Sequence, residues 1–211
     1  MSAGESRLRG LYAITSQAVV TEPGRLLGAV AAALRGGVRL LQYRDKWNPA
    51  AVRERHVRRL LPLCRAHGVP LIVNDDAELA RATGADGVHL GAADAALDEA
   101  RRLLGRRALI GATCGNSLQR ARAAVAAGAD YVAFGRFFPS TTKPDAPPAE
   151  LATLRAARAE LDVPLCAIGG VSPDHVPLLI EAGADLVAAI AGVFDAADVE
   201  TAARAYAKCF T

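Results

Sequence analysis

The sequence predicts a (β/α)8 barrel that takes up the chain as one domain, residues 1–211. Three observations support this fold class: eight short apolar runs, amphipathic segments between them, and a motif that recurs along the chain. Eight parallel strands joined by crossover helices close into such a barrel. A doubly wound open sheet is the alternative, but such a sheet rarely provides eight evenly spaced units.

The predicted strands are rich in β-formers and lie at 11–15, 38–43, 69–73, 86–90, 108–112, 130–134, 163–168 and 185–190. The segments between them are rich in Ala, Leu and Arg, with apolar residues three and four positions apart, as amphipathic helices require. After the second strand, for example, these positions hold Val52, His56, Leu60, Leu63 and Cys64. Each segment is long enough for a crossover helix.

The pattern Gly-Ala-Asp-x-Val occurs at 84–88, 128–132 and 183–187, and Gly36-Gly37-Val38 is a degenerate copy. In each copy we expect the glycine to end a helix, because glycine tolerates the left-handed conformation found there. The repeat therefore supports the count of strand and helix pairs.

Composition favours a cytoplasmic protein that acts on small molecules. The 211 residues are 52% hydrophobic, which is enough for one large core. A net charge of +3 and only 5% aromatic residues argue against a nucleic-acid partner. No apolar stretch approaches the roughly 18 residues that cross a bilayer, so we expect no membrane partner. A homo-oligomer is allowed, because nothing in the sequence fixes the oligomeric state.

The four cysteines, Cys64, Cys114, Cys166 and Cys209, are far apart and form no C-x-x-C pair. They are interpreted as reduced and mostly buried thiols. Because no sequence feature supplies a base for Cys114, covalent catalysis is not expected. His89 lies within a predicted strand and is interpreted as a hydrogen-bonded core histidine.

Gln42, Arg44 and Lys46 alternate where the second predicted strand leaves the core. Alternate residues of a strand share a face, so the three donor groups are expected to converge. An amide, a guanidinium and an ammonium group match phosphate or diphosphate oxygens better than a neutral ligand. The alternative is a strand that ends in solvated charge.

Polar groups also follow the other predicted strands, at the end of a barrel where catalysis takes place. These groups are Asn74, Asp75 and Asp76, then Asp94, Thr113 and the run Ser140, Thr141, Thr142 and Lys143. The turns Gly169-Gly170 and Ile190-Ala191-Gly192 offer backbone N–H groups of the kind that bind phosphate, although ordinary turns have the same composition. Residues 139–148 are interpreted as a lid over the substrate, with a plain surface loop as the alternative.

Asp75 and Asp94 follow neighbouring strands and are predicted to bind one Mg²⁺ ion together with phosphate oxygens and water. Helix capping is the alternative role for each aspartate. A diphosphate ester carries a charge of roughly −3. Arg44, Lys46 and Lys143 supply three positive charges, and the two aspartates cancel two of them. A divalent cation is therefore needed to balance the charge of the diphosphate.

Together, the motifs Q-x-R-x-K, N-D-D, G-V-H-L-G-x-x-D, a hydroxyl on the fifth strand, P-S-x-T-K and A-I-G-G-V resemble thiamine phosphate synthase. The resemblance runs from near Leu11 to the last strand and implies the same barrel. It also implies a transferase of thiamine biosynthesis that joins 4-amino-2-methyl-5-(diphosphooxymethyl)pyrimidine to a (carboxy)thiazole phosphate and releases diphosphate, with Mg²⁺ as cofactor. The aminopyrimidine would stabilise a methylene cation while the protein stabilises the departing diphosphate.

The resemblance implies a role for each matched residue. The pyrimidine diphosphate would be bound by Gln42, Tyr43, Arg44, Asp45, Lys46, Asn74, Thr113 and Lys143. The thiazole phosphate would be bound by Ser140, Thr141, Thr142, Gly170, Ile190 and Ala191. Asp75 and Asp94 would hold the metal, and Arg44, Thr113 and Lys143 would be catalytic.

Four positions depart from the family pattern. Thr113 replaces a serine, Gly115 a histidine, Arg136 a proline and Ala191 a polar residue. The hydroxyl at position 113 is kept, whereas Ala191 leaves phosphate contact there to the backbone N–H.

Two other functions fit part of the pattern. A thiazole tautomerase has a similar barrel but needs a proton-transferring side chain at the position of Gly115, and glycine has none. A phosphate-binding barrel without catalysis could serve as a ligand sensor. The pair Asp75 and Asp94 argues against that function.

Overall fold

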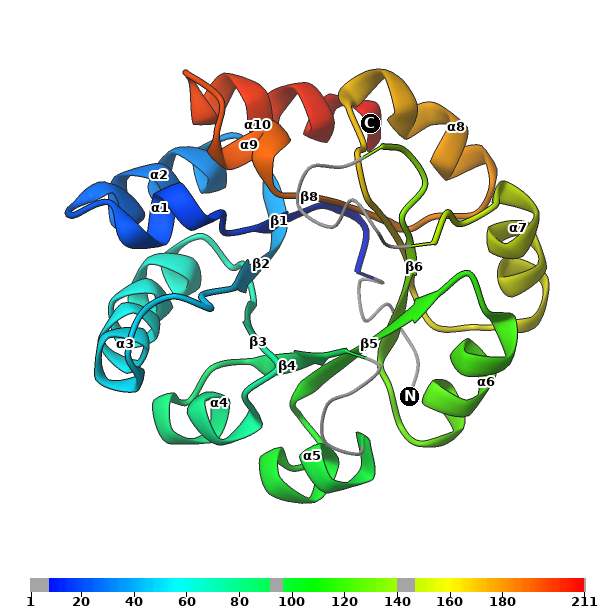
Figure 1. Cartoon of the computed structure of the whole chain (residues 1–211), viewed down its shortest axis with the longest axis horizontal. Helices are drawn as coiled ribbons and strands as arrows, with labels where there is room; N and C mark the ends of the chain where they lie inside the picture. Colours follow the sequence, from blue (N-terminus) through cyan, green and yellow to red (C-terminus); the bar gives the residue numbers. More distant parts are fainter. Residues whose placement is uncertain (1–7, 92–96, 140–146, 211) are drawn as a thin grey trace.

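The computed structural model describes residues 8–91, 97–139 and 147–210, and it contains a closed barrel of eight parallel strands. The strands follow one another around the barrel in chain order, and β8 closes it by pairing with β1. Figure 1 shows the strands as a central ring that the helices surround. The predicted (β/α)8 fold is therefore confirmed.

The strands are β1 (Gly10–Ile14), β2 (Val38–Tyr43), β3 (Leu71–Asn74), β4 (Gly87–Leu90), β5 (Leu109–Gly115), β6 (Tyr131–Gly135), β7 (Leu165–Ile168) and β8 (Leu186–Ala189). All eight predicted strands are present, with small shifts at their ends. β3 and β7 begin directly after Pro70 and Pro164, because proline has no N–H to donate to the neighbouring strand. β5 runs further than predicted and its pairing with β6 is irregular between Thr113 and Gly115.

The helices are α1 (Gln17–Thr21), α2 (Arg25–Arg35), α3 (Ala50–Ala66), α4 (Ala77–Thr83), α5 (Leu97–Leu104), α6 (Leu118–Ala126), α7 (Leu151–Glu160), α8 (Val176–Glu181), α9 (Ala191–Phe194) and α10 (Val199–Ala207), with short 3₁₀ turns η1 (Pro173–His175) and η2 (Lys208–Phe210). In α3 the buried stripe is Val57, Leu60, Leu61 and Cys64. The predicted stripe was thus displaced by about one residue at its first positions, and its spacing of three and four residues was correct.

The strand pleat separates two apolar layers. On β1, Leu11 and Ala13 pack outward against the helices, whereas Tyr12 and Ile14 lie in the barrel interior. On β2, Tyr43 belongs to the outer layer, and Gln42 and Arg44 line the interior. This alternation decides which side chains reach a cavity at the carboxyl ends of the strands.

The repeated aspartates join neighbouring strands at their beginnings. Asp86, Asp130 and Asp185 each donate a backbone N–H to a carbonyl of the preceding strand, and each carboxylate accepts the N–H of that same residue. In the third copy, Asp185 Oδ2 accepts from Leu165 N at 2.9 Å and from Arg158 Nη1 at 2.9 Å. Gly84, Gly128 and Gly183 have positive φ, as predicted for the ends of helices, and in the degenerate copy Gly37 has positive φ whereas Gly36 does not. The aspartates of the repeat thus hold neighbouring strands in register.

We expect Asp185→Ala to lower the free energy of unfolding by about 2 kcal/mol, because it leaves the buried Leu165 N–H without this acceptor. For a chain of this length the midpoint of thermal unfolding should fall by about 4–8 °C. Glu54→Ala is a matched control, since it removes only an exposed ion pair with Arg58 and should cost about 0.5 kcal/mol or less. Equal melting temperatures for the two variants would contradict this role.

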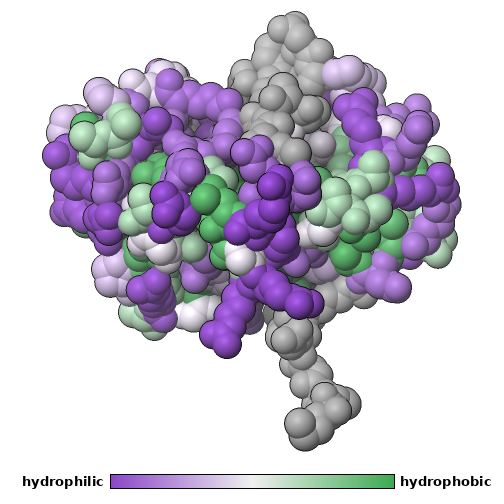
Figure 2. All heavy atoms as spheres, turned by 90° about the horizontal axis from the view of Figure 1, so that it is seen from below, coloured by the Kyte–Doolittle hydropathy of each residue, from purple (hydrophilic) through white to green (hydrophobic). Residues whose placement is uncertain are grey.

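The side that carries α4 and α5 is mainly hydrophilic, and hydrophobic residues form separate patches on it (Figure 2). Within the described ranges, no helix combines the length and apolarity that a membrane span requires. All four cysteines are free thiols, and Cys64, Cys114 and Cys166 are buried as predicted.

Candidate active site

A cavity of about 420 Å³ opens at the carboxyl ends of the strands. We call it the central cavity. Residues from all eight strands or the loops after them contribute to it, among them Ile14, Gln42, Arg44, Asn74, His89, Thr113, Gly135, Ile168, Gly170, Ala188, Ile190 and Ala191. The cavity therefore occupies the position that barrel enzymes use for catalysis.

The charge of the central cavity is positive. Its described lining contains Arg44, Arg120 and Arg136 but no aspartate or glutamate. Burial lowers the pKa of the Arg44 guanidinium from its ordinary value, and the carboxylate of Asp75 partly opposes this shift. In the described part of the chain, no carboxylate accepts a hydrogen bond from that guanidinium. A partly buried cation of this kind is stabilised when an anion enters the cavity.

Arg44 is held firmly where β2 leaves the barrel. Its backbone N–H donates to Thr15 Oγ1 at 2.8 Å, and the same hydroxyl donates to the Arg44 carbonyl oxygen at 3.0 Å. Its guanidinium carbon lies 5.5 Å from the ring centroid of Trp47, which is 41% exposed. This cation–π contact restrains the guanidinium of Arg44, which lines the central cavity.

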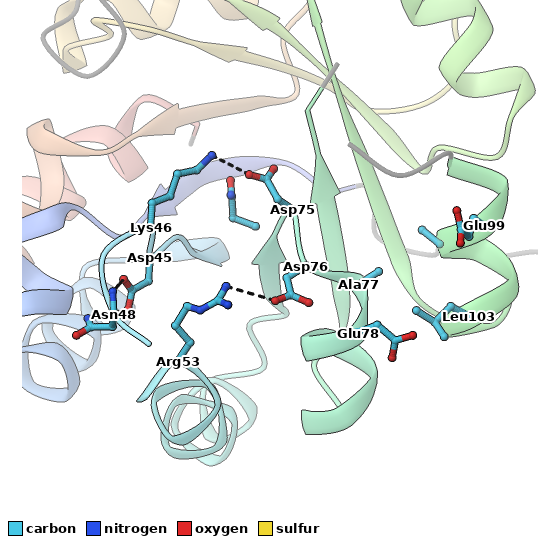
Figure 3. Close-up of a pocket in the computed structure, with 12 residues that line it drawn as sticks. Asp45, Lys46, Asn48, Arg53, Asp75, Asp76, Ala77, Glu78, Glu99 and Leu103 are labelled. Atoms are coloured by element: carbon cyan, nitrogen blue, oxygen red, sulfur yellow. Dashed lines mark hydrogen bonds and ion pairs between the residues drawn. The ribbon is translucent and has the colours of Figure 1, made fainter. Parts of the chain in front are cut away.

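A second cavity, of about 640 Å³, lies beside the first, between the loop after β2 and helices α4 and α5. We call it the peripheral cavity (Figure 3). Acidic residues dominate its lining, which includes Asp45, Asp75, Asp76, Glu78 and Glu99 together with Lys46 and Arg53. Asn74 lines both cavities, so a cationic and an acidic compartment meet at the end of β3.

Asp75 stands at this junction. Lys46 Nζ lies 2.9 Å from Asp75 Oδ2, and the two side chains point toward one another in Figure 3. Among the residues that the structure describes, Asp75 is the one non-glycine residue with positive φ, at 63°. A left-handed aspartate costs free energy that the surrounding structure must offset, and such residues cluster at functional sites.

Tyr43 and Asp45 do not reach the central cavity. Tyr43 is buried on the outer face of the barrel, and its hydroxyl donates to Asp45 Oδ2 at 2.6 Å. Asp45 also accepts hydrogen bonds from Trp47 N and from the backbone and side chain of Asn48. Burial opposes ionisation of Asp45, but these hydrogen bonds outweigh it and lower its pKa. The carboxylate thus shapes the loop that carries Arg44 and Lys46.

The loops after β6 and β7 are packed together. Phe138 N donates to Gly169 O at 2.9 Å, and Phe137 N donates to Ile168 O at 3.2 Å. Gly170 has φ 63°, and a Cβ at this position would overlap the carbonyl oxygens of Phe138 and Pro139. Glycine is therefore required here, and its backbone is left facing the central cavity as a phosphate site needs.

Several predicted site residues lie outside the described ranges. They are Asp94 and the run Ser140, Thr141, Thr142 and Lys143. The structure brings together Gln42, Arg44, Asn74, Thr113, Gly170, Ile190 and Ala191 in the central cavity, and it places Lys46 and Asp75 in the adjoining peripheral cavity.

Known proteins resemble this chain over nearly its whole length. Residues 11–193 match the family described as thiamine monophosphate synthase. The chain belongs to that family. A relative from Aromatoleum aromaticum named thiamine-phosphate synthase is 52% identical over 206 residues, which is 98% of each chain. Another of the same name, from Nitrosococcus oceani, is 50% identical over 97% of this chain and 94% of its own.

A solved structure gives the same result. The thiamine phosphate pyrophosphorylase of Pyrococcus furiosus superposes with a TM-score of 0.87 and 31% identity, covering 97% of this chain and 96% of that one. The resemblance predicted from the motifs is therefore confirmed, both for the family and for the fold.

In this member of the thiamine monophosphate synthase family, the central cavity contains residues that the sequence did not single out as site residues. Those with hydroxyl, imidazole or guanidinium groups are Tyr12, His89, Arg120 and Arg136. The prediction that His89 is a hydrogen-bonded core residue is correct, since it is 8% exposed and contacts Tyr131 and Thr113. It also faces the cavity, which strand alternation could have indicated only if the inward face of β4 had been known.

Two further positions bear on the chemistry of the site. Gly115 has φ 62°, and Nη1 of Arg120 lies 3.8 Å from the place where a Cβ of Gly115 would stand. Cys114 faces the outer apolar layer, and burial raises the pKa of its thiol to about 11, although Arg120 opposes this. A neutral thiol turned away from the cavity is consistent with the expectation that Cys114 does not act as a nucleophile.

Proposed function

We propose that the protein condenses 4-amino-2-methyl-5-(diphosphooxymethyl)pyrimidine with a (carboxy)thiazole phosphate to form thiamine phosphate and diphosphate. The observation that carries this proposal is the junction of a cationic and an acidic cavity at the end of β3, in a chain of the thiamine monophosphate synthase family. Full-length relatives about half identical to this chain, named thiamine-phosphate synthase, support the transferase prediction.

The diphosphate lies across the junction. Gln42 and Arg44 donate to it from the central cavity, and Lys46 donates from the loop that follows β2. Lys46 exchanges its contact with Asp75 for a phosphate oxygen when the diphosphate binds. Lys143, which follows β6 in the sequence, is the third predicted cation and would complete the neutralisation.

Asp75 supplies a hard oxygen donor beside the diphosphate, and this suits Mg²⁺, which commonly uses one or two carboxylates with phosphate oxygens and water. The described residues contain no group of three or more His, Cys, Asp or Glu side chains that could hold a metal. A site completed by Asp94 and the substrate needs no such group. When bound, Mg²⁺ would offset the negative charge that grows on the departing diphosphate.

The thiazole phosphate occupies the other side of the central cavity. Gly170, Ile190 and Ala191 present backbone to it. The predicted residues Ser140, Thr141 and Thr142, which follow β6 in the sequence, would contact the same phosphate. In this arrangement the thiazole nitrogen and the reacting carbon of the pyrimidine are held side by side, which lowers the entropic part of the barrier.

The side chains bind, orient and donate hydrogen bonds, and none needs to abstract a proton from carbon. Thr113 donates to the leaving oxygens, Arg44 and Lys143 stabilise their charge, and the apolar residues Ile14, Ala133 and Ile168 exclude water around the cation. The absence of a general base among the predicted residues is consistent with this chemistry.

We also propose a cytoplasmic enzyme built as one domain over residues 1–211. Free thiols at all four cysteines suit a reducing compartment. An assembly of identical chains, and the lack of a nucleic-acid partner, stay predictions from the sequence.

The experiment that tests the proposal mixes the protein with both substrates and Mg²⁺ and follows thiamine phosphate by chromatography. We expect product in the complete mixture, release of one diphosphate per product, and loss of activity when a chelator removes the metal. Isomerisation of the thiazole alone would support the tautomerase instead. Binding of phosphate ligands without either reaction would support a sensor.

A further inference from the structure

Four buried polar side chains and the partly buried Thr113 form a continuous hydrogen-bonded chain across the barrel interior. Gln42 Nε2 donates to Tyr12 Oη at 2.6 Å, and Tyr12 Oη lies 2.8 Å from Tyr131 Oη. Tyr131 Oη lies 3.0 Å from His89 Nδ1, and His89 Nε2 lies 2.9 Å from Thr113 Oγ1. We call this set the polar chain. It links two predicted substrate-binding residues, Gln42 and Thr113, through three residues with no predicted role in the reaction.

The polar chain is held in place by the packing of the barrel interior. Its residues come from β1, β2, β4, β5 and β6, and Tyr12, Gln42, Tyr131 and His89 are all at most 8% exposed. The Tyr12 and Tyr131 rings meet edge to face, with centroids 5.9 Å apart. A Cβ at Gly111 would overlap the end of the Tyr131 ring and His89 Nδ1. Glycine at this strand position is therefore what allows the tyrosine and the histidine to meet.

The donor at one end sets the direction of every other bond. Because the Tyr12 hydroxyl accepts from Gln42, its single proton goes to Tyr131. The Tyr131 proton then goes to His89 Nδ1, which must accept it, so a neutral His89 carries its proton on Nε2. That N–H donates to Thr113 Oγ1 and turns the hydroxyl proton of Thr113 away from the ring, toward the central cavity.

We propose that Tyr12, Tyr131 and His89 are positioning residues that fix the Thr113 hydroxyl as a hydrogen-bond donor to the ligand of the central cavity. The identity of that ligand, the pyrimidine diphosphate, rests on the proposed function. The direction of the chain does not, because it follows from the orientation of the Gln42 amide. A donor held in place before the reaction begins is worth more than one that must reorient as charge develops.

The first test measures the tautomer of His89 by ¹⁵N NMR of histidine-labelled protein, with His89→Gln used to assign its signals. We expect the proton on Nε2. His56 is an internal control of the opposite kind: the Tyr43 hydroxyl donates to Asp45 and can only accept from His56, so His56 should carry its proton on Nδ1. An Nδ1–H tautomer at His89 would mean that the chain runs in the reverse direction and would overturn the inference.

The second test is a double-mutant cycle on turnover. Tyr131→Phe keeps the ring and breaks the chain, and we expect kcat to fall about tenfold with KM changed less than about threefold. In a Thr113→Val background the same change should lower kcat by less than about twofold, because the group it positions is gone. Tyr12→Phe should lower kcat in the same way, and it replaces Tyr131→Phe in the cycle if that variant folds poorly. His89→Gln, which keeps a donor near the place of Nε2, should retain more activity than His89→Leu.

Thr83→Val is the matched control for the loss of a threonine hydroxyl, since Thr83 bonds only within α4 and lines neither cavity. Its kcat should equal that of the unmodified protein. Additive effects of Tyr131→Phe and Thr113→Val would reduce the polar chain to a packing role and overturn the inference. If the unmodified protein forms no thiamine phosphate, the proposed function fails, and the His89 tautomer still decides the direction of the chain.

Discussion

Replacing Asp75 by alanine is expected to abolish turnover while leaving the barrel folded. Asp75 is the carboxylate at the junction of the two cavities, and it faces the ammonium group of Lys46 at 2.9 Å. Without it, both the predicted metal ligand and the partner that holds Lys46 are lost. We expect kcat to fall by at least about 100-fold, as when a group that stabilises transition-state charge is removed. Steady-state formation of thiamine phosphate measures the loss.

The backbone of Asp75 calls for a second variant. Alanine in a left-handed conformation costs about 1–2 kcal/mol, whereas asparagine tolerates it. Asp75→Asn therefore separates loss of the charge from backbone strain, and its far-ultraviolet circular dichroism should match the unmodified protein. Glu78→Ala removes another carboxylate of the peripheral cavity and should keep most of the activity. Full activity of Asp75→Asn would refute the metal assignment.

Arg44→Ala is expected to weaken diphosphate binding about 10- to 100-fold, the range that loss of a hydrogen bond to a charged group gives. The effect should be large because this guanidinium is partly buried and packs against Trp47, and Thr15 holds the backbone of Arg44 in place. The affinity of Arg44→Lys for diphosphate should lie between those of the unmodified protein and Arg44→Ala, since an ammonium group keeps the charge and loses the planar fork of the guanidinium. Calorimetric titration with inorganic pyrophosphate gives the affinities.

Arg35→Ala is the control for Arg44→Ala, because Arg35 pairs with Glu200 on the outer helices and lines neither cavity. Its affinity for pyrophosphate should be unchanged. If Arg44→Ala also binds as tightly as the unmodified protein, the role given to Arg44 is wrong.

The barrel could be predicted because its determinants are local. Each strand is a short apolar run before a polar end, and each Gly-Ala-Asp-x-Val copy marks the passage from a helix to the next strand. The aspartate of the repeat had no predicted role of its own. Its function is a paired contact with a preceding strand that lies 15 or 20 residues earlier, and only the register of the sheet reveals it.

The site was predictable near the carboxyl ends of the strands and less so deeper in the barrel interior. Gln42, Arg44 and Asn74 reach the central cavity as expected, since alternation and strand ends located them. Tyr43 and Asp45 are neighbours in the same motif, yet the pleat turns Tyr43 outward, and Asp45 is used by its own loop. The pleat also decided which buried tyrosines would face inward, so Tyr12 and Tyr131 could not be recognised from their residue types.

A crystal structure of the protein with inorganic pyrophosphate and Mg²⁺ tests the central claim most directly. The claim is that the junction of the two cavities takes up a leaving diphosphate through cationic side chains and a divalent ion. We predict pyrophosphate oxygens within hydrogen-bond distance of Gln42, Arg44 and Lys46, with the metal bound to Asp75. An empty junction, or pyrophosphate bound elsewhere with Asp75 still paired to Lys46, would contradict the claim.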